Sequence, residues 1–333
     1  MRIWLVGILL LGAPVWASSL LLTGARHEYQ RFNNCGPATL AMALSYWGSS
    51  LTQQQIAPVL KPNKSDKNVS PEEMARYARG LGFGVHLGVG GDLALLRQLL
   101  RGGFPVIVET WFVTEHGGMG HYRLLVGYDD AQGFFHALDS YLGPRVRLPY
   151  AELDRLWQVF NRTYLVVYPK HRRLELGPRA SAEAELGLAL RRARQEIAQN
   201  PLDPFAWFNL GSSLLQRGEP WAAAQAFDRS RQLPFDQSLD PRRPSGVPHG
   251  WPWRMLWYQF GPYAAYYQTG RYPEVIKLAS DVLARAPDHE ESYYWRAMAR
   301  KALGDGAGAR ADLQAALRFR PGYPEALRAL QAF

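Results

Sequence analysis

The spacing of apolar side chains along the chain changes from a helical period to a strand-like one, and later returns to the helical period. Residues 36–47 carry apolar side chains three and four positions apart and stop at a glycine, which predicts a helix. A second helix should start at Ser70, because Ser70 and Glu73 match a capping box and Pro71 suits a first turn. A third helix is predicted over residues 92–99.

Four apolar runs rich in β-branched and aromatic residues follow the first helices. Such runs, bounded by glycine and other turn-forming residues, are typical of strands. They cover residues 104–113, 122–128, 133–138 and 163–168. Helices followed by an antiparallel sheet make an α+β plan, and we expect residues 18–170 to form one domain of this class.

From about residue 181 the strand signals fade, and small residues and prolines recur with a fixed period. Gly270 and Gly304 are 34 residues apart, and so are Pro287 and Pro321. An earlier unit, residues 207–234, shows small and aromatic residues at the same offsets. This spacing resembles the tetratricopeptide repeat, a helix pair whose arrays offer a concave face to peptides or proteins.

The repeat pattern predicts an all-α domain over residues 181–333, joined to the first domain by a linker at residues 171–180. A stretch rich in proline and glycine interrupts the array, so we expect an insertion near residues 235–255. The resemblance implies that the repeats bind a protein partner or the substrate.

The first residues have the pattern of a signal peptide. A positive start at Arg2 precedes an apolar stretch, and small or apolar residues lead to a cleavage site after Ala17. Residues 1–17 are therefore predicted to direct export to the periplasm or the medium, with an uncleaved amino-terminal anchor as the alternative. No later stretch is apolar enough to span a bilayer, so no stable membrane insertion is expected after signal removal.

Composition narrows the function classes. The 333 residues suit two domains, and 47% hydrophobic residues argue against a mainly disordered chain. The net charge of +9 is spread thinly, without the concentrated basic face that nucleic-acid binding requires. The single cysteine, Cys35, excludes a disulfide-stapled scaffold and multi-cysteine metal sites, and we expect no metal or organic cofactor.

Cys35 stands between Asn33-Asn34 and Gly36-Pro37, at the predicted start of a helix. Unpaired N–H groups and the helix dipole would stabilise a thiolate there, which is the nucleophilic form of cysteine. An isolated thiol is more often a buried structural cysteine. Such a cysteine belongs on an apolar face inside an element, so this position favours a nucleophile.

A nucleophilic thiol needs a base and a group that orients the base. His121 lies at the start of a predicted strand, and Asp139 lies on the next one. A turn at residues 129–131 would pair the two directly across the hairpin, although a bulge at the following glycine would shift this register. The competing bases are His136, expected on the opposite strand face from Asp139, and His116, in the neighbouring loop.

Acyl transfer also needs a hydrogen-bond donor for the developing oxyanion. Gln30, five residues before Cys35, can supply its side-chain amide from the loop that leads to the helix. A loop glutamine is most often simply solvated, so this assignment has the least support from the residues alone.

Together these residues resemble the bacteriocin-processing, double-glycine leader peptidase family and its exported relatives, which are papain-like cysteine peptidases. The family pattern is a glutamine shortly before a Cys-Gly motif that opens a helix, then a His-Tyr strand and an aspartate on the following strand. In this chain these positions are Gln30, Cys35-Gly36-Pro37, His121-Tyr122 and Asp139. The resemblance covers roughly residues 25–170, and the glutamine lies one residue closer to the cysteine than in the leader peptidases.

The resemblance implies an α+β papain-like cysteine peptidase domain, here followed by an all-α tetratricopeptide-like domain. We therefore expect an exported peptidase that acts on a peptide or protein through a Cys-His-Asp triad. The Gly-Gly leader substrate does not carry over, because leader peptidases are cytoplasmic domains of membrane transporters. Cell-wall peptide hydrolysis and transpeptidation remain open at the same site. The alternative is a non-catalytic binding or assembly factor that uses the fold to grip peptides.

Overall fold

Seven antiparallel strands form one sheet in the first part of the chain, in the order β2-β7-β3-β4-β5-β6, with β1 paired to β4. The computed structural model describes residues 18–242 and 250–332, so the predicted signal peptide lies outside the described residues. The strands are β1 (Ser19–Leu21), β2 (Gly84–Gly88), β3 (Val106–Thr114), β4 (Gly117–Asp129), β5 (Phe134–Asp139), β6 (Gly143–Pro149) and β7 (Tyr164–Tyr168).

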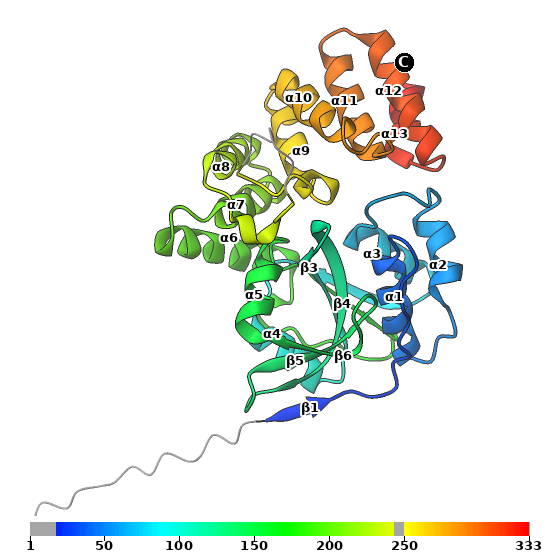
Figure 1. The fold of residues 1–333 in the computed structure, drawn as a ribbon, viewed down its shortest axis with the longest axis vertical. Coiled ribbons are helices and arrows are strands. Elements are labelled where there is room, and N and C mark those ends of the chain that lie inside the picture. Colours follow the sequence, from blue (N-terminus) through cyan, green and yellow to red (C-terminus); the bar gives the residue numbers. More distant parts are fainter. Residues whose placement is uncertain (1–17, 243–249, 333) are drawn as a thin grey trace, which may run out of the picture.

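Five helices pack around this sheet, which confirms the predicted α+β class (Figure 1). They are α1 (Cys35–Tyr46), α2 (Gln53–Leu60), α3 (Pro71–Gly80), α4 (Leu93–Arg101) and α5 (Tyr150–Gln158). At the start of α3 the Ser70 hydroxyl accepts from the Glu73 N–H, and the Glu73 carboxylate accepts from the Ser70 N–H. The predicted capping box is therefore confirmed.

The two faces of the sheet have separate cores. Leu124 of β4 and Leu165 of β7 pack against α1, α2 and α3 on one face. Leu125 of β4 and Val166 of β7 pack against α4 and α5 on the other. Helix α1 is buried from residue 36 to residue 45, as expected for a helix that is apolar on all sides. This enclosed helix fixes the position of Cys35 at its amino end.

The register of β4 and β5 differs from the predicted one. Asp129 pairs with Phe134, so the turn is longer than expected, and a further irregularity follows at residues 125–127. As a result Asp139 pairs with Arg123, and the predicted direct pairing with His121 is wrong. Because His121 is two residues from Arg123, it still projects from the same face of β4 and lies diagonal to Asp139.

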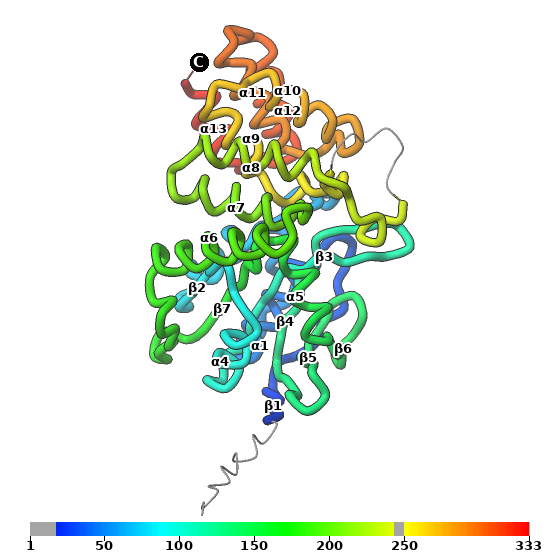
Figure 2. The backbone as a smooth tube through the Cα atoms, turned by 90° about the vertical axis from the view of Figure 1, so that its left-hand side faces the viewer, coloured from blue at the N-terminus to red at the C-terminus, as the bar shows by residue number. Residues whose placement is uncertain are grey.

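The rest of the described chain is helical, which confirms the predicted all-α repeat domain (Figures 1 and 2). Its helices are α6 (Ala182–Gln199), α7 (Pro204–Gln216), α8 (Pro220–Gln232), α9 (Gly261–Gln268), α10 (Tyr272–Leu283), α11 (Glu290–Ala302), α12 (Gly306–Phe319) and α13 (Pro324–Gln331). Three short 3-10 helices are η1 (Gly177–Arg179), η2 (Gln237–Leu239) and η3 (Met255–Trp257). In the described ranges, no helix is both long and apolar enough to cross a membrane.

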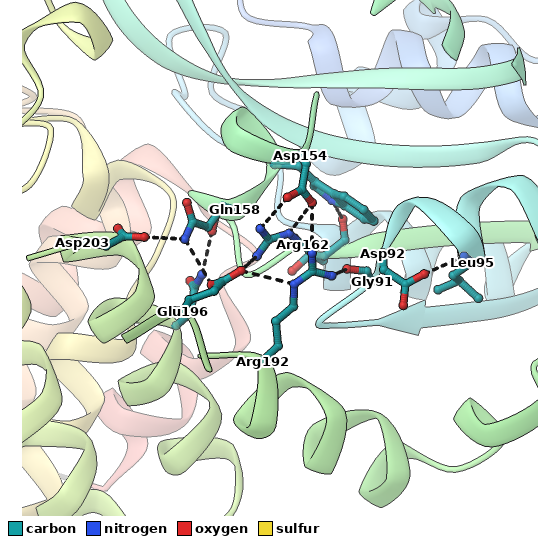
Figure 3. A network of polar contacts seen from close by, with 12 residues as sticks. Gly91, Asp92, Leu95, Asp154, Gln158, Arg162, Arg192, Glu196 and Asp203 are labelled. Carbon is teal, nitrogen blue, oxygen red and sulfur yellow. Dashed lines mark hydrogen bonds and ion pairs between the residues drawn. The ribbon is translucent and has the colours of Figure 1, made fainter. Parts of the chain in front are cut away.

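The repeat domain lies against the first domain through a partly buried polar network (Figure 3). The Arg162 side chain, just after α5, bridges Asp154 Oδ1 at 2.7 Å and Glu196 Oε1 of α6 at 2.8 Å. Arg192 of α6 donates to the carbonyl oxygen of Gly91 at 2.7 Å. Since these partners come from both domains, the network fixes how the first repeat helix sits on the sheet domain.

The segment between α8 and α9 makes a second contact, on the β3–β4 hairpin. The Trp111 indole N–H of β3 donates to the carbonyl oxygen of Leu239 at 2.7 Å. The Arg254 guanidinium donates to the carbonyl oxygens of Gly118 at 3.0 Å and His116 at 3.1 Å. The segment therefore holds the hairpin that leads directly into His121.

Candidate active site

Cys35 is the first residue of α1, as the sequence predicted. Asn34 is the cap residue, and Asn33 before it adopts a left-handed backbone with φ of 52°. The cysteine is partly buried, and its side chain packs against the core that α1 shares with the sheet. The thiol thus lies at the amino end of a helix that the core holds rigidly.

The surroundings of the thiol do not produce the expected thiolate. Burial raises the pKa of Cys35 to about 11, and the nearby Glu109 carboxylate adds to the rise. The backbone N–H groups of Tyr122 and Gly36, and the Lys61 ammonium, lower the pKa but do not compensate. The free protein therefore holds a neutral thiol, since the desolvation of Cys35 outweighs the effect of the helix terminus.

The amino-terminal part of α1 lies against β4. The backbone N–H of Tyr122 lowers the pKa of the Cys35 thiol, and the Thr39 hydroxyl of α1 donates to the Tyr122 carbonyl oxygen at 3.3 Å. Tyr122 directly follows His121 in β4. Cys35 therefore lies against the strand segment that carries the predicted base.

His121 and Asp139 are hydrogen-bonded as predicted, with 2.9 Å between Nε2 and Oδ1. Both side chains are buried. Burial would raise the pKa of Asp139, but the hydrogen bond and charge of His121 and the charge of Arg123 hold it well below its usual range. An ionised carboxylate only accepts hydrogen bonds, so His121 carries its proton on Nε2.

This arrangement leaves Nδ1 as the ring nitrogen of His121 that can accept a proton. Burial lowers the pKa of His121, the hydrogen bond and charge of Asp139 oppose this, and Arg123 adds to the lowering. The imidazole is therefore neutral near pH 7 and suited to act as a general base. Its ring packs against Phe112 with 4.9 Å between ring centroids.

Asp139 is held by more groups than the sequence indicated. Its Oδ1 also accepts the backbone N–H groups of Tyr141 at 2.8 Å and Leu142 at 2.9 Å. Its Oδ2 accepts a hydrogen bond from Nε of Arg123 at 2.8 Å. The Arg123 guanidinium in turn donates to the Thr110 hydroxyl. These contacts fix the carboxylate in one orientation toward His121.

Gln30 lies beside Ser140, the residue that directly follows Asp139. The backbone N–H of Gln30 donates to the Ser140 carbonyl oxygen at 2.8 Å, and the Ser140 hydroxyl donates to Gln30 Oε1 at 2.8 Å. Because the oxygen end of the amide is held by Ser140, the NH₂ end is the one oriented for donation elsewhere. Residues from three parts of the first domain thus meet around Asp139.

The two competing histidines lie elsewhere. His136 of β5 is opposite Gly127 and Arg147 in the sheet and packs on Phe134, with 4.9 Å between centroids. The His116 ring is exposed and lies 3.4 Å from the Glu115 carboxylate. His121 is therefore the histidine paired with the Asp139 carboxylate, whereas His27 Nε2 lies 2.9 Å from the backbone oxygen of Asp139.

Three side chains at this site were not predicted. Arg123 and Glu109 are charged residues inside apolar strand runs, and this interruption was a signal that the sequence offered. Tyr258 comes from the segment between α8 and α9, and an added Cβ at Gly120 would lie 3.0 Å from its ring. No sequence signal connects Tyr258 to the first domain, because only the packing of the two domains brings it there. Among the described residues, no group of three or more histidine, cysteine or acidic side chains could hold a metal ion.

Two family models agree with this architecture. The Peptidase C39-like family matches residues 23–165, and the tetratricopeptide repeat matches residues 174–236 and 265–324. No curated protein matches the sequence. A solved C39-like peptidase from Bacillus anthracis shares 17% identity, covers 47% of this chain and all of its own, and gives a TM-score of 0.39.

Two further solved structures match the repeat-containing chain. MamA from Desulfovibrio magneticus RS-1 is 18% identical over 44% of this chain and 73% of its own, with a TM-score of 0.35. YrrB, a tetratricopeptide protein with a peptide-binding site, is 15% identical over 44% of this chain and 84% of its own, with a TM-score of 0.24. The protein thus consists of a Peptidase C39-like domain followed by tetratricopeptide repeats.

Proposed function

We propose that the protein is an exported cysteine peptidase that cleaves peptide bonds through Cys35, His121 and Asp139. The observation that carries this proposal is the 2.9 Å bond between His121 and the ionised Asp139, on the β4 segment against which α1 and Cys35 pack. Export rests on the signal-peptide pattern of residues 1–17.

The proposed reaction follows the order of a thiol acyl transfer. His121 Nδ1 takes the proton of Cys35 as the sulfur attacks the peptide carbonyl carbon, and Asp139 stabilises the imidazolium that forms. The Gln30 amide and the Cys35 backbone N–H donate to the oxyanion. The imidazolium then gives its proton to the departing amine, leaving a thioester on Cys35. Water, activated by His121, hydrolyses the thioester and restores the thiol.

The high pKa of the thiol shapes this mechanism. With a pKa of about 11 for Cys35 and a neutral His121, the resting site holds a thiol and an imidazole, not an ion pair. The proton is transferred as the carbon–sulfur bond forms, so the site relies on general-base catalysis. The charge pair exists only while a substrate occupies the site.

A second candidate function is supported by the same pKa. A protein that only grips peptides has no need of a reactive thiol, and burial keeps the Cys35 thiol neutral. In that case the peptidase-like cleft and the repeats would act together as a binding or assembly factor. In either case the tetratricopeptide repeats serve protein interaction, and we propose that they bind the substrate or a protein partner.

The two functions are distinguished by cleavage of a defined peptide library, followed by mass spectrometry. The mature protein, Cys35→Ala, His121→Gln and a matched control, His136→Gln, are incubated with the library at pH 8. A peptidase predicts products with the wild type and the control and none with the two site variants. Products that persist in Cys35→Ala, or none with the wild type, would reject the catalytic function in favour of the binding factor.

A further inference from the structure

A cavity of about 330 Å³ lies between the first domain and the repeat domain, next to the candidate active site. One wall comes from the first domain, with the start of α3, Glu109 of β3 and the turn at residues 160–163. The other wall comes from α7 and from residues 258–261 of the repeat domain. None of the four predicted site residues lines this cavity.

Part of the cavity lining lies over Gly120, the residue before His121. An added Cβ at Gly120 would lie 3.0 Å from both the Phe160 and Tyr258 rings and 3.1 Å from Glu109 Oε1. The three side chains that meet there also line the cavity. Since Gly120 adjoins His121 in β4, a group held against these three side chains would lie near the strand segment that carries the base.

The ionisable carboxyl groups that line the cavity are not matched by any basic side chain in the described part of its lining. Glu109 and Glu72 line it, and the lining residues within the described ranges include no lysine or arginine. Glu109 is 5% exposed, and burial raises the pKa of its carboxyl well above the usual range, with the neighbouring Glu72 adding to the rise. A hydrogen bond with Tyr122 lowers this pKa without compensating and brings no positive charge, and the Tyr122 hydroxyl donates to the Val69 carbonyl oxygen. Arg254, near Tyr258, is hydrogen-bonded to backbone carbonyl oxygens of the β3–β4 hairpin.

Without a counter-charge in the cavity the buried Glu109 carboxyl is kept protonated, and a cation that enters with good hydrogen-bond geometry stabilises its ionised form. The volume is at the lower end of the range of about 300–1,000 Å³ that is typical of small-molecule sites. It therefore suits one side chain or chain terminus and not a folded partner. The aromatic rings of Tyr258 and Phe160 can also contact a cation favourably.

We propose that this cavity is a substrate subsite that binds a positively charged group of the peptide, with Glu109 as its anion. The cation is a lysine or arginine side chain, or the amino terminus of the peptide. This inference rests on the proposed function, because the bound chain is taken to lie across Cys35. It also means that the repeat domain builds one wall of the substrate cleft.

The test measures binding without catalysis, using Cys35→Ala in the otherwise intact chain. The probes are acetylated heptapeptide amides in which one lysine is moved along an alanine-glycine background, each matched by a norleucine peptide. A non-acetylated set tests the amino terminus. At one position we expect lysine to bind about tenfold or more tightly than norleucine, measured by calorimetry. A preference only for the non-acetylated set assigns the cavity to the amino terminus.

Glu109→Gln in the same background should reduce the lysine-to-norleucine ratio to about one. Glu115→Gln, an exposed glutamate on the hairpin, is the matched control and should keep the ratio. Ser212→Arg places a cation in the cavity from the α7 wall and should abolish the preference with Glu109 intact. Equal binding of every lysine and norleucine pair without a preference for a free amino terminus, or a preference that survives both Glu109→Gln and Ser212→Arg, overturns the inference.

Failure of the subsite and failure of the catalytic function give different results. Wild-type cleavage without any charge preference in Cys35→Ala overturns the subsite and leaves the peptidase standing. A charge preference in Cys35→Ala without wild-type cleavage supports the subsite and rejects the catalytic step.

Discussion

At the scale of single residues, the candidate site depends on opposing electrostatic effects. Asp139 stays ionised although it is buried, because His121, Arg123 and two backbone N–H groups all donate to it. Cys35 remains neutral because its burial has no comparable compensation. The same physical cost, desolvation, therefore has opposite outcomes at the two residues.

The reactivity of Cys35 should follow its raised pKa. Because only the thiolate reacts, the rate of alkylation by iodoacetamide should rise about tenfold per pH unit from pH 7 to pH 10. Its midpoint should lie near pH 11, the pKa that burial imposes on Cys35. N-acetylcysteine measured in parallel serves as the control. A rate that levels off below pH 8 would show a stabilised thiolate and contradict this account.

Replacing Asp139 should affect stability as well as activity. Asp139→Asn leaves the buried Arg123 guanidinium without its carboxylate partner, which typically costs about 3–5 kcal/mol of the free energy of unfolding. Urea denaturation measures the loss. Asp129→Asn, at the far end of β4, is the control and should change little. A loss below about 1 kcal/mol for Asp139→Asn would mean that Arg123 does not depend on this carboxylate.

At the scale of elements, the sequence was informative about which segments are helices and strands, and less so about how strands pair. The capping residues of α3 and the apolar run of β3 were evident from local pattern. The register of β4 and β5 depends on the length of the turn and on an irregularity within the ladder, which local pattern does not encode. Asp139 was found nevertheless, because a shift of two residues keeps side chains on the same face.

The capping box of α3 should contribute measurably to stability. Ser70→Ala removes the hydroxyl that accepts the Glu73 N–H, and loss of such a cap costs about 0.5–2 kcal/mol. Thermal or urea denaturation should show this loss. Ser70→Asp, which retains an acceptor at the cap, is expected to restore most of it. Equal stability of the wild type and Ser70→Ala would show that the cap is energetically neutral.

At the scale of the whole molecule, ion pairs between basic and acidic side chains hold the repeat domain on the first domain. Lys67 pairs with Asp288 at 2.9 Å, and Arg320 pairs with Glu73 across the junction. The junction also buries Asp66 and Glu290, and no hydrogen bond in the described structure reaches either Glu290 oxygen. This junction could not be predicted from the sequence, because its paired residues come from distant segments that share no pattern.

These carboxylates should make stability fall as pH rises. Burial raises the pKa of Asp66 to about 7 and that of Glu290 to about 8. The folded protein then binds more protons than the unfolded one up to about pH 8, and each extra proton lowers stability by about 1.4 kcal/mol per pH unit. His289, whose pKa burial lowers to about 4, acts in the opposite direction only below about pH 6.5.

Denaturation should therefore show decreasing stability between pH 6.5 and pH 8. Glu290→Gln removes one of the titrating groups and should reduce this slope. The exposed Glu175→Gln serves as the control and should retain the wild-type slope. If stability rises over this range in the wild type, or the slope is unchanged in Glu290→Gln, the junction is not what couples pH to folding.

The proposed peptidase reaction requires that Cys35 forms a thioester with the carbonyl carbon of a cleaved peptide. It is tested most directly by acid quenching of the wild-type protein with a peptide that it cleaves, followed by intact-mass and peptide mapping. We expect an added mass equal to the acyl part of the peptide, located on Cys35 and absent in His121→Gln. Cleavage without an adduct on Cys35, or an adduct that forms equally in His121→Gln, would contradict it.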